Sequence, residues 1–411
     1  SCRGCIALML GLVLVGLGCG PGDSGSESAV ETNRPPNILW VIWDTVRADR
    51  LSPYNPALRT TPRLEAWAKG ARVFEDTVSP ASTTESSHAS MFTGQLPSRH
   101  GTDASNRWLA DEWETVAERL RQAGYRTFLW SANPHVSAGE NFDQGFDRVA
   151  HPWDPIYRDQ ALKIVTRKVS GDRSSELSDR LQRARVGPWA IKAAGELAAV
   201  GLENWLDTEG RDRPWFAVLN YMEAHRPLIP PRAYRERVMS PEQVEESYRI
   251  DRSWLPLWRY NAGLHDYSNE ELAVIRGTYD ASLAELDDLF AELLASLDSQ
   301  GWLENTIVIL TSDHGEHLGE HHLLDHQYSL YRPLTHVPLI IAAPGRWTPG
   351  RDTRPVTTLD LYPTVLEWAG LQGSGRDSSR ARSLLREGSA RARISEYSAP
   401  NLEPLAAVAR S

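Results

Sequence analysis

Residues 38–43 read ILWVIW and are followed directly by Asp44. An unbroken apolar run of this length is typical of a strand buried on both faces of a parallel sheet. Similar runs predict further strands at 127–130, 215–219, 306–311 and 337–342. Apolar residues that recur every three or four positions predict helices at 113–120, 272–297 and 361–369. This alternation predicts an α/β fold with a mostly parallel central sheet and helices on both faces.

Polar side chains follow four of these predicted strands at the point where each strand ends. Asp44 follows the first strand, Asn133 and His135 the second, His225 the third, and the pair Asp313-His314 the fourth. Ligands of parallel α/β sheets bind outside the carboxyl ends of the strands. We therefore expect these side chains to gather at one functional edge of the sheet.

The segment 306–316 reads TIVILTSDHGE, so an apolar strand leads into adjacent Asp313 and His314. Carboxylate oxygens suit hard divalent ions, and imidazole suits zinc or manganese. Gly315 permits the tight turn that would let both side chains reach one ion. Taken alone, Asp44 is better explained as a helix N-cap. A polar turn is the alternative for the Asp-His pair, but Asp-His-Gly at the end of a strand is an unusual sequence for a simple turn.

The segment 79–94 reads SPASTTESSHASMFTG, which is dense in hydroxyl groups and ends in a predicted helix. A helix N-terminus presents free backbone N–H groups and a positive dipole end, which suit an anion. An ordinary serine-rich loop is the alternative interpretation.

Composition excludes several functional classes. The 411 residues carry a formal net charge of −10, which argues against a protein that binds nucleic acid through its phosphates. The three cysteines all lie at or before Cys19, so the folded body has no disulfide, thiolate metal site or cysteine nucleophile.

The first residues are typical of a bacterial export signal. Residues 1–19 are expected to form a signal peptide, with Cys19 as the lipid-anchored residue of a lipoprotein. A plain secretion signal or an uncleaved anchor is the alternative. Residues 20–36 are rich in Gly, Ser, Glu and Pro and predict a flexible linker. We therefore expect export to the bacterial cell envelope, in the periplasm or anchored to a membrane.

Together these features resemble the sulfatase branch of the alkaline phosphatase superfamily over residues 37–370. The resemblance implies an alkaline-phosphatase-like catalytic domain, one or two divalent ions (Ca, Mg, Mn or Zn) and an anionic ester substrate. Residues 371–411 would then be a partial C-terminal segment of a truncated subdomain. Besides Asp44, the stretches that carry the resemblance are 87–94, 97–101, 124–127, 223–227, 312–316 and 360–364.

The resemblance also implies roles for individual residues. Asp44, Asp313 and His314 match metal ligands, and Thr84 matches the catalytic nucleophile, which also binds the metal. His225 and His326 match catalytic positions that contact the anionic group or the leaving group. Substrate-binding residues are predicted at His88, Asn133 and His135. Asn133 and His135 lie in the segment that takes the place of the Gly-Lys-Trp-His segment with which many sulfatases hold sulfate, and that segment is absent here.

The chain departs from a typical sulfatase at the nucleophile. That position holds Thr84, and the proline and arginine that normally follow it are absent. Threonine is not a substrate for oxidation to formylglycine. Phosphodiesterases and phosphotransferases of the superfamily resemble this chain in having threonine there. The sequence thus predicts a metal-dependent hydrolase or transferase of phosphate or sulfate esters. The alternatives are a formylglycine-independent sulfuric ester hydrolase and a non-catalytic surface binding protein.

Two further patterns have competing interpretations. Residues 317–321 read HLGEH, which fits the H-x-x-E-H pattern of inverted zinc proteases. Against this stands Gly319, because glycine weakens the helix that such a motif requires. Trp254, Trp258 and Trp302 could line a substrate pocket, but we interpret them as packing residues.

Overall fold

The computed structural model describes residues 34–169, 187–209, 211–372, 380–386 and 392–397. The predicted signal peptide, most of the predicted linker and much of the segment after residue 370 lie outside these residues. Within them, no helix combines the length and apolarity needed to cross a membrane.

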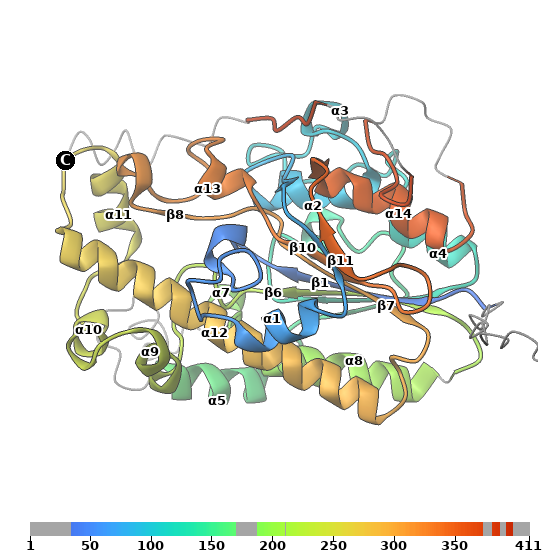
Figure 1. The fold of residues 1–411 in the computed structure, drawn as a ribbon, viewed down its shortest axis with the longest axis horizontal. Helices are drawn as coiled ribbons and strands as arrows, with labels where there is room; N and C mark the ends of the chain where they lie inside the picture. Colours follow the sequence, from blue (N-terminus) through green and yellow to red (C-terminus); the bar gives the residue numbers. More distant parts are fainter. Residues whose placement is uncertain (1–33, 170–186, 210, 373–379, 387–391, 398–411) are drawn as a thin grey trace, which may run out of the picture. The chain divides into compact units, whose positions relative to one another are not determined.

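An eight-stranded sheet forms the centre of the fold, in the order β11-β2-β10-β7-β1-β6-β4-β5 (Figure 1). Only β10 runs antiparallel to its neighbours, so the predicted mostly parallel sheet is confirmed. The strands of this sheet are β1 (Asn37–Trp43), β2 (Arg72–Phe74), β4 (Arg126–Ser131), β5 (Arg148–Ala150), β6 (Trp215–Tyr221), β7 (Thr306–Thr311), β10 (Leu339–Ala342) and β11 (Gly350–Asp352). Two small ribbons pair β3 (Thr77–Val78) with β12 (Val356–Thr357) and β8 (His317–Leu318) with β9 (Leu324–Asp325).

The apolar run of β1 separates two hydrophobic cores. Leu39, Val41 and Trp43 face one core, whereas the alternate residues, such as Trp40, face the other. This is the two-sided burial that an unbroken apolar strand predicts. Helices on the Val41 side are α1 (Pro62–Ala68), α5 (Arg158–Lys168), α8 (Glu196–Glu209) and α12 (Asn269–Ser299). Helices on the Trp40 side are α2 (Thr84–Thr93), α4 (Val116–Gln122) and α14 (Leu361–Trp368).

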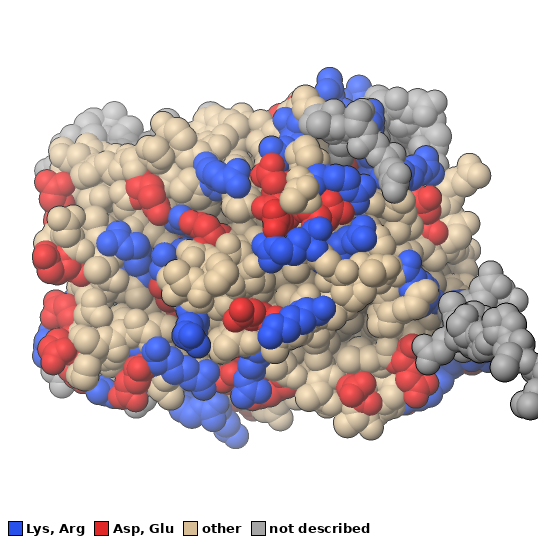
Figure 2. Space-filling model, viewed as in Figure 1, with Lys and Arg blue, Asp and Glu red and all other residues tan. Residues whose placement is uncertain are grey.

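Shorter helices fill the connections between these elements. They are α3 (Pro97–His100), α7 (Pro188–Ile191), α9 (Arg232–Val238), α10 (Pro241–Ser247), α11 (Trp254–Asn261) and α13 (Arg332–Thr335). Single 3-10 turns lie at Ala48–Arg50, Ala138–Glu140, Glu320–His322 and Thr358–Asp360. On the face seen in Figure 2, acidic and basic side chains of the described residues are interspersed.

All five predicted strands and all three predicted helices are present. The helix predicted at 272–297 extends further at its start, because Ser268 and Glu271 form a capping box. Of the three tryptophans interpreted as packing residues, Trp302 is buried, but Trp254 is 38% exposed and stacks against the Arg226 guanidinium. Trp254 also contacts the Trp258 ring at 5.1 Å, so it packs against other side chains, although at the surface of the protein.

Trp40→Ala tests the two-sided core. Trp40 is fully buried against Phe92 and Phe216, so its truncation should lower the free energy of unfolding by about 3–5 kcal/mol. Trp108 is 47% exposed, and Trp108→Ala should change the same quantity by only about 0.5 kcal/mol. Urea denaturation followed by circular dichroism measures both, and equal losses would contradict this placement of β1.

Candidate active site

The carboxyl ends of four neighbouring strands meet at one edge of the sheet. β1 lies between β7 and β6, and β4 lies beyond β6. Asp44 directly follows β1, and Asp313 and His314 follow β7. Asn133 follows β4 and His225 follows β6. The structure thus confirms that polar groups far apart in sequence gather at this edge.

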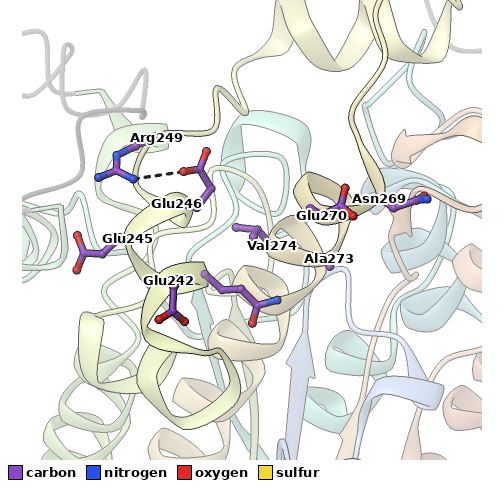
Figure 3. Close-up of a pocket in the computed structure, with 9 residues that line it drawn as sticks. Glu242, Glu245, Glu246, Arg249, Asn269, Glu270, Ala273 and Val274 are labelled. Carbon is purple, nitrogen blue, oxygen red and sulfur yellow. Dashed lines mark hydrogen bonds and ion pairs between the residues drawn. The ribbon is translucent and has the colours of Figure 1, made fainter.

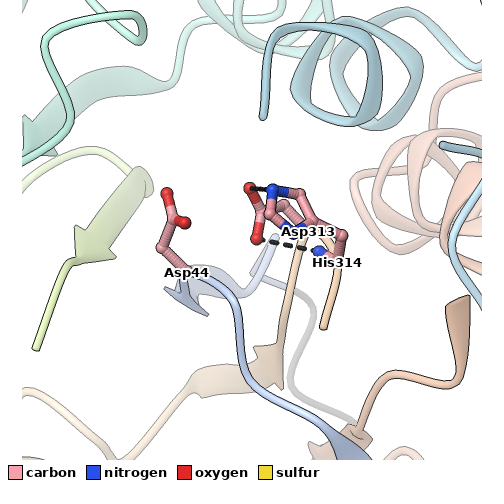
Figure 4. A group of neighbouring side chains, drawn as sticks. All are labelled: Asp44, Asp313 and His314. Carbon is pink, nitrogen blue, oxygen red and sulfur yellow. Dashed lines mark hydrogen bonds and ion pairs between the residues drawn. The ribbon is translucent and has the colours of Figure 1, made fainter. Parts of the chain in front are cut away.

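Asp44, Asp313 and His314 form a buried cluster whose potential ligand atoms lie within 4.8 Å of one another (Figure 4). Asp44 Oδ2 accepts a hydrogen bond from Asn133 Nδ2 at 2.8 Å, whereas Asp44 Oδ1 has no hydrogen-bond partner. Asp313 Oδ2 also has none, although its Oδ1 accepts from the Thr45 and His314 amides. Two buried carboxylate oxygens without donors fit a bound cation, because unpaired buried charge is costly. Asp44 therefore does not act as a helix N-cap.

The backbone fixes the tautomer of His314. His314 Nδ1 donates to the Gly315 carbonyl at 2.9 Å, so the lone pair lies on Nε2. Nε2 lies 3.4 Å from Asp313 Oδ2 and 3.4 Å from Thr84 Oγ1. Burial, with a contribution from His326, lowers the pKa of His314 to about 4. The imidazole is thus neutral near pH 7, as a metal ligand must be.

Burial controls the ionisation of both carboxyl groups. It raises the pKa of Asp44 to about 7, assisted by the charge of Asp313. It also raises the pKa of Asp313 to about 6. Either protons or a cation must therefore neutralise this cluster. Two carboxylates and one imidazole are compatible with manganese, zinc, magnesium or calcium.

Thr84 is the first residue of α2, and its side chain is 5% exposed. Thr84 Oγ1 lies 3.4 Å from Asn133 Nδ2 and 3.4 Å from His314 Nε2, which places the hydroxyl beside the metal-ligand cluster. Two other hydroxyls of the serine-rich segment, on Ser79 and Ser87, donate to the Asp313 carbonyl. The hydroxyl-dense segment thus presents Thr84 and also fastens the strand end that carries Asp313.

His88 has both ring nitrogens engaged within the protein. Nδ1 donates to the Thr84 carbonyl at 3.0 Å, and Nε2 accepts from Asn220 Nδ2 at 3.2 Å. The ring is fully buried, and burial lowers its pKa to about 3. Binding of a substrate by His88 would require one of these hydrogen bonds to break. The observed contacts favour a positioning role beneath Thr84.

His326 sits in an ion-pair network that sequence reasoning missed. Its Nδ1 lies 2.9 Å from Asp325 Oδ1 and 3.2 Å from Glu316 Oε2, and Arg226 donates to Asp325 Oδ2 at 2.8 Å. Burial alone would lower the pKa of His326, but the charges of Asp325 and Glu316 raise it well above 6.5. The His326 ring lies 4.6 Å from the His314 ring, so an imidazolium stands next to the cluster.

Glu316, Asp325 and His326 also bring three potential ligand atoms within 4.8 Å of one another. Arg226 already pairs with Asp325, and His326 is held in its charged form. These contacts favour an ion-pair network over a second metal site. The resemblance predicted His326, and Arg226 and Glu316 lie in the stretches 223–227 and 312–316 that carry it, whereas Asp325 had no sequence signal.

His225 and His135 lie at the margin of the cluster. The His225 ring is 5.2 Å from the His326 ring, and its Nδ1 donates to the Arg226 carbonyl. His135 lies 3.8 Å from a Glu85 carboxylate oxygen and 3.7 Å from one of Glu140. His225 is thus the nearer of the two to the imidazolium of His326.

The H-x-x-E-H interpretation is wrong. His317 lies in the short strand β8, and Gly319 adopts a left-handed conformation with φ of 110°. Glu320 pairs with Arg47, and His321 stacks on Tyr331. The motif lacks the helix that would place both histidines on one ion.

An open groove between α10 and the start of α12 lies apart from this edge of the sheet (Figure 3). Carboxylates of Glu242, Glu245, Glu246 and Glu270 line it, and Arg249 pairs with Glu246 at 3.4 Å. This lining would repel an anionic ester, so the groove does not compete with the strand-end cluster as the reaction site.

Comparison with known proteins agrees with this geometry. A family model described as Sulfatase matches residues 36–371. The choline-sulfatase of Rhizobium meliloti is 27% identical over 362 residues, covering 83% of this chain and 69% of that protein. Arylsulfatase K of Xenopus laevis is 42% identical over 371 residues, covering 83% and 64%. The chain thus spans about two thirds of the length of these relatives.

Solved structures share the fold. A phosphonate monoester hydrolase from Silicibacter pomeroyi superposes with a TM-score of 0.64 at 23% identity, covering 85% of this chain and 76% of that chain. The corresponding enzyme from Agrobacterium radiobacter gives a TM-score of 0.63 at 22% identity, covering 82% and 74%. The alkaline-phosphatase-like architecture expected from the sequence is confirmed.

Asp44→Asn tests the cluster through stability. In the metal-free protein the pKa of Asp44 is raised to about 7 from 3.8, so the folded state binds the extra proton between these values. Metal-free stability should therefore fall as the pH rises from 4 to 7. Asp44→Asn removes the buried charge, so the stability of this metal-free variant should fall less as the pH rises. Thermal unfolding after chelation measures the effect.

Added Mn²⁺ should raise the melting temperature of the parent protein at pH 7 and raise that of Asp44→Asn much less, because a ligand is lost. Asp298→Asn, at an exposed aspartate of α12, is the matched control and should respond as the parent does. An equal response of Asp44→Asn and the parent would show that the ion binds elsewhere.

Proposed function

The chain belongs to the sulfatase family of ester hydrolases, and on that premise we propose that it cleaves phosphate or sulfate esters with Thr84 as the nucleophile. One observation carries the proposal: the Thr84 hydroxyl lies 3.4 Å from His314 Nε2, beside two carboxylate oxygens that have no donor. A hydroxyl in that position can share a cation with the carboxylates. The non-catalytic alternative would leave this buried charge without a purpose.

Asp44, Asp313, His314 and the Thr84 hydroxyl would hold the divalent ion. When bound, such an ion lowers the pKa of a coordinated hydroxyl and neutralises charge on the ester oxygens. The chain's own residues supply the remaining elements. Asn133 orients Asp44, and Ser79 and Ser87 hold the strand end that carries Asp313.

Thr84 would attack the phosphorus or sulfur atom in line with the leaving alcohol. The Thr84 hydroxyl proton would pass to solvent when the ion is bound. Thr84 Oγ1 would then form a bond to that atom while the bond to the leaving oxygen breaks. His326 would donate its proton to the departing oxygen, since its neighbours keep it protonated. The N-terminal amides of α2 suit the equatorial oxygens of the anion. Water, or an acceptor alcohol in a transferase, would then attack the same atom and give its proton to His326, while the bond from that atom to Thr84 Oγ1 breaks and restores the Thr84 oxygen.

Both ester classes are candidates for this site. The similar proteins are named for sulfate esters and for phosphonate monoesters. The residue at position 84 favours phosphoryl transfer, because threonine cannot be converted to formylglycine and must act through its own hydroxyl. A sulfuric ester hydrolase that works without formylglycine is the second candidate, and the sulfatase family match supports it.

We also propose that the protein is exported and anchored to a bacterial membrane through Cys19. The apolar segment before this residue supports the proposal. Metabolic labelling with palmitate tests it, and a Cys19→Ser chain that still incorporates the label would contradict it.

Thr84→Ala should reduce kcat/KM by at least about a thousandfold, because no other described hydroxyl contacts His314 Nε2. Thr84→Ser keeps a hydroxyl and should retain part of the activity. The variant Thr166→Ala, at an exposed threonine of α5, is the control and should keep full activity. Assays with nitrophenyl phosphate, phosphodiester and sulfate substrates, with metal content measured in each variant, test this. Full activity of Thr84→Ala would remove the mechanism.

His326→Gln should slow esters of poor leaving alcohols by about 10²–10⁴-fold and affect nitrophenyl esters far less, because general acid catalysis matters most where the leaving oxygen is basic. Asp325→Asn should also slow esters of poor leaving alcohols more than nitrophenyl esters. The loss should be smaller than in His326→Gln, because Glu316 still contacts His326. A plot of log kcat/KM against leaving-group pKa provides the test. A uniform loss across all esters would assign His326 to binding instead.

A further inference from the structure

The chain turns directly after Asp44, and the turn begins with an unusual backbone conformation. Thr45 is left-handed, with φ of 63°. Left-handed backbone brings Cβ close to the following carbonyl oxygen, and a β-branched side chain adds to this crowding. Among the non-glycine residues that the structure describes with positive φ, Thr45 alone is β-branched. The surrounding structure must therefore hold this turn against a local cost in free energy.

The hydroxyl of Tyr279, on α12, holds the turn at two points. It donates to the Thr45 carbonyl at 2.8 Å and accepts from the Arg47 amide at 3.0 Å. Tyr279 is fully buried, so neither backbone group could pair with water in its place. Tyr279 also lies in the apolar pattern that predicted α12, and phenylalanine would fill the same space in the core. What the hydroxyl adds to this packing is its pair of bonds to the turn.

The turn connects the two loops that carry the carboxylates of the cluster. The Thr45 amide donates to Asp313 Oδ1 at 3.1 Å, and the Val46 amide donates to Ser312 Oγ at 2.9 Å. These bonds join the chain that follows β1 to the chain that follows β7. A different backbone conformation at Thr45 would redirect the residues after it and turn the Val46 amide away from Ser312. The left-handed turn thus helps to keep Asp44 beside Asp313.

Arg47 extends this support to the loop that follows His314. Its amide is fixed by Tyr279, and Nη1 of its guanidinium donates to the Glu316 carbonyl at 3.2 Å and to a Glu320 carboxylate oxygen at 2.7 Å. Arg47 is only 5% exposed, so these bonds are largely shielded from water. One buried hydroxyl on α12 therefore supports the loops on both sides of the cluster.

We propose that Tyr279 is a positioning residue of the metal site, whose hydroxyl holds Thr45 left-handed and thereby keeps the Asp44 and Asp313 carboxylates together for one cation. This inference rests on the proposed function, because it takes these carboxylates as the ligands of the ion. Without the hydroxyl, the Thr45 carbonyl and the Arg47 amide lose their partner. The strained turn then relaxes, and the two carboxylates no longer meet at the distance that one ion requires.

Calorimetric titration of the metal-free protein with Mn²⁺ tests the proposal without turnover. Tyr279→Phe should weaken Mn²⁺ binding about 10–100-fold, which is typical for the loss of a group that orients metal ligands. Glycine adopts left-handed backbone without strain, so adding Thr45→Gly to Tyr279→Phe should restore the affinity to within about threefold of the parent. A residue that merely stabilises the core would not be rescued by this second change.

Tyr54→Phe is the matched control for Tyr279→Phe. The Tyr54 hydroxyl also bonds two backbone groups, because it donates to the Leu339 carbonyl at 3.1 Å and accepts from the Leu339 amide at 2.8 Å. These bonds hold the start of β10 instead of the turn after Asp44. Both variants should lower the melting temperature of the metal-free protein to a similar extent. Only Tyr279→Phe should bind Mn²⁺ more weakly.

The outcomes separate this inference from the proposed function. Parent-like affinity in Tyr279→Phe, or an equal loss in Tyr54→Phe, would overturn the positioning role and leave the proposed function standing. Weak binding that persists after Thr45→Gly is added would show that the hydroxyl does not act through this turn, and would also overturn the role. Should Tyr279→Phe alone fail to fold, the affinity of the double variant decides in the same way. If the parent binds no Mn²⁺, the proposed function and the positioning role both fall.

Discussion

Two carboxylate oxygens, Asp44 Oδ1 and Asp313 Oδ2, lie buried at the edge of the sheet without a hydrogen-bond donor. Charge that is removed from water must be neutralised by a proton or met by a cation. The remaining parts of the site are arranged around this requirement. His314 turns its lone pair towards the two oxygens, and Thr84 places a hydroxyl within 3.4 Å of that lone pair. A cation bound between Asp44 Oδ1 and Asp313 Oδ2 would give both oxygens the partner that the protein itself does not provide.

The sheet topology explains how such a cluster arises. Four adjacent parallel strands end at the same level, so residues as distant as Asp44 and Asp313 become neighbours. Hydrogen bonds between the connecting loops then fix the geometry: the Val46 amide donates to Ser312 Oγ, and the Thr45 amide donates to Asp313 Oδ1. On the other side of the cluster, the charged His326 is secured by Asp325 and Glu316. The proposed cation ligands and the proposed proton donor are thus neighbours, with the His314 and His326 rings 4.6 Å apart.

The sequence could predict the parts of this arrangement that depend on local pattern. Apolar runs ending in Asp44 and Asp313 showed both the strands and the polar edge, because burial follows from the apolar run and parallel pairing from the alternation of strands with helices. The antiparallel direction of β10 and the three-residue strands β2, β5 and β11 left no such pattern. The metal-binding and nucleophilic roles of the cluster stay predictions, although the structure brings these residues together as expected.

Contacts between distant residues could not be predicted in the same way. Arg226 reaches Asp325 across 99 positions of sequence, and no spacing indicates that this pair surrounds His326. The H-x-x-E-H motif shows the opposite error. Its local pattern suggested a helix, but β8 pairs with β9 in a ribbon and Gly319 lies between the two strands.

The central claim is that a divalent ion binds between Asp44, Asp313 and His314 beside the Thr84 hydroxyl. Anomalous diffraction from a crystal soaked in Mn²⁺ tests it most directly. The account predicts one strong peak within ligand distance of Asp44 Oδ1, Asp313 Oδ2, His314 Nε2 and Thr84 Oγ1. A map without a peak there, or with its only peak between Glu316 and Asp325, would contradict it.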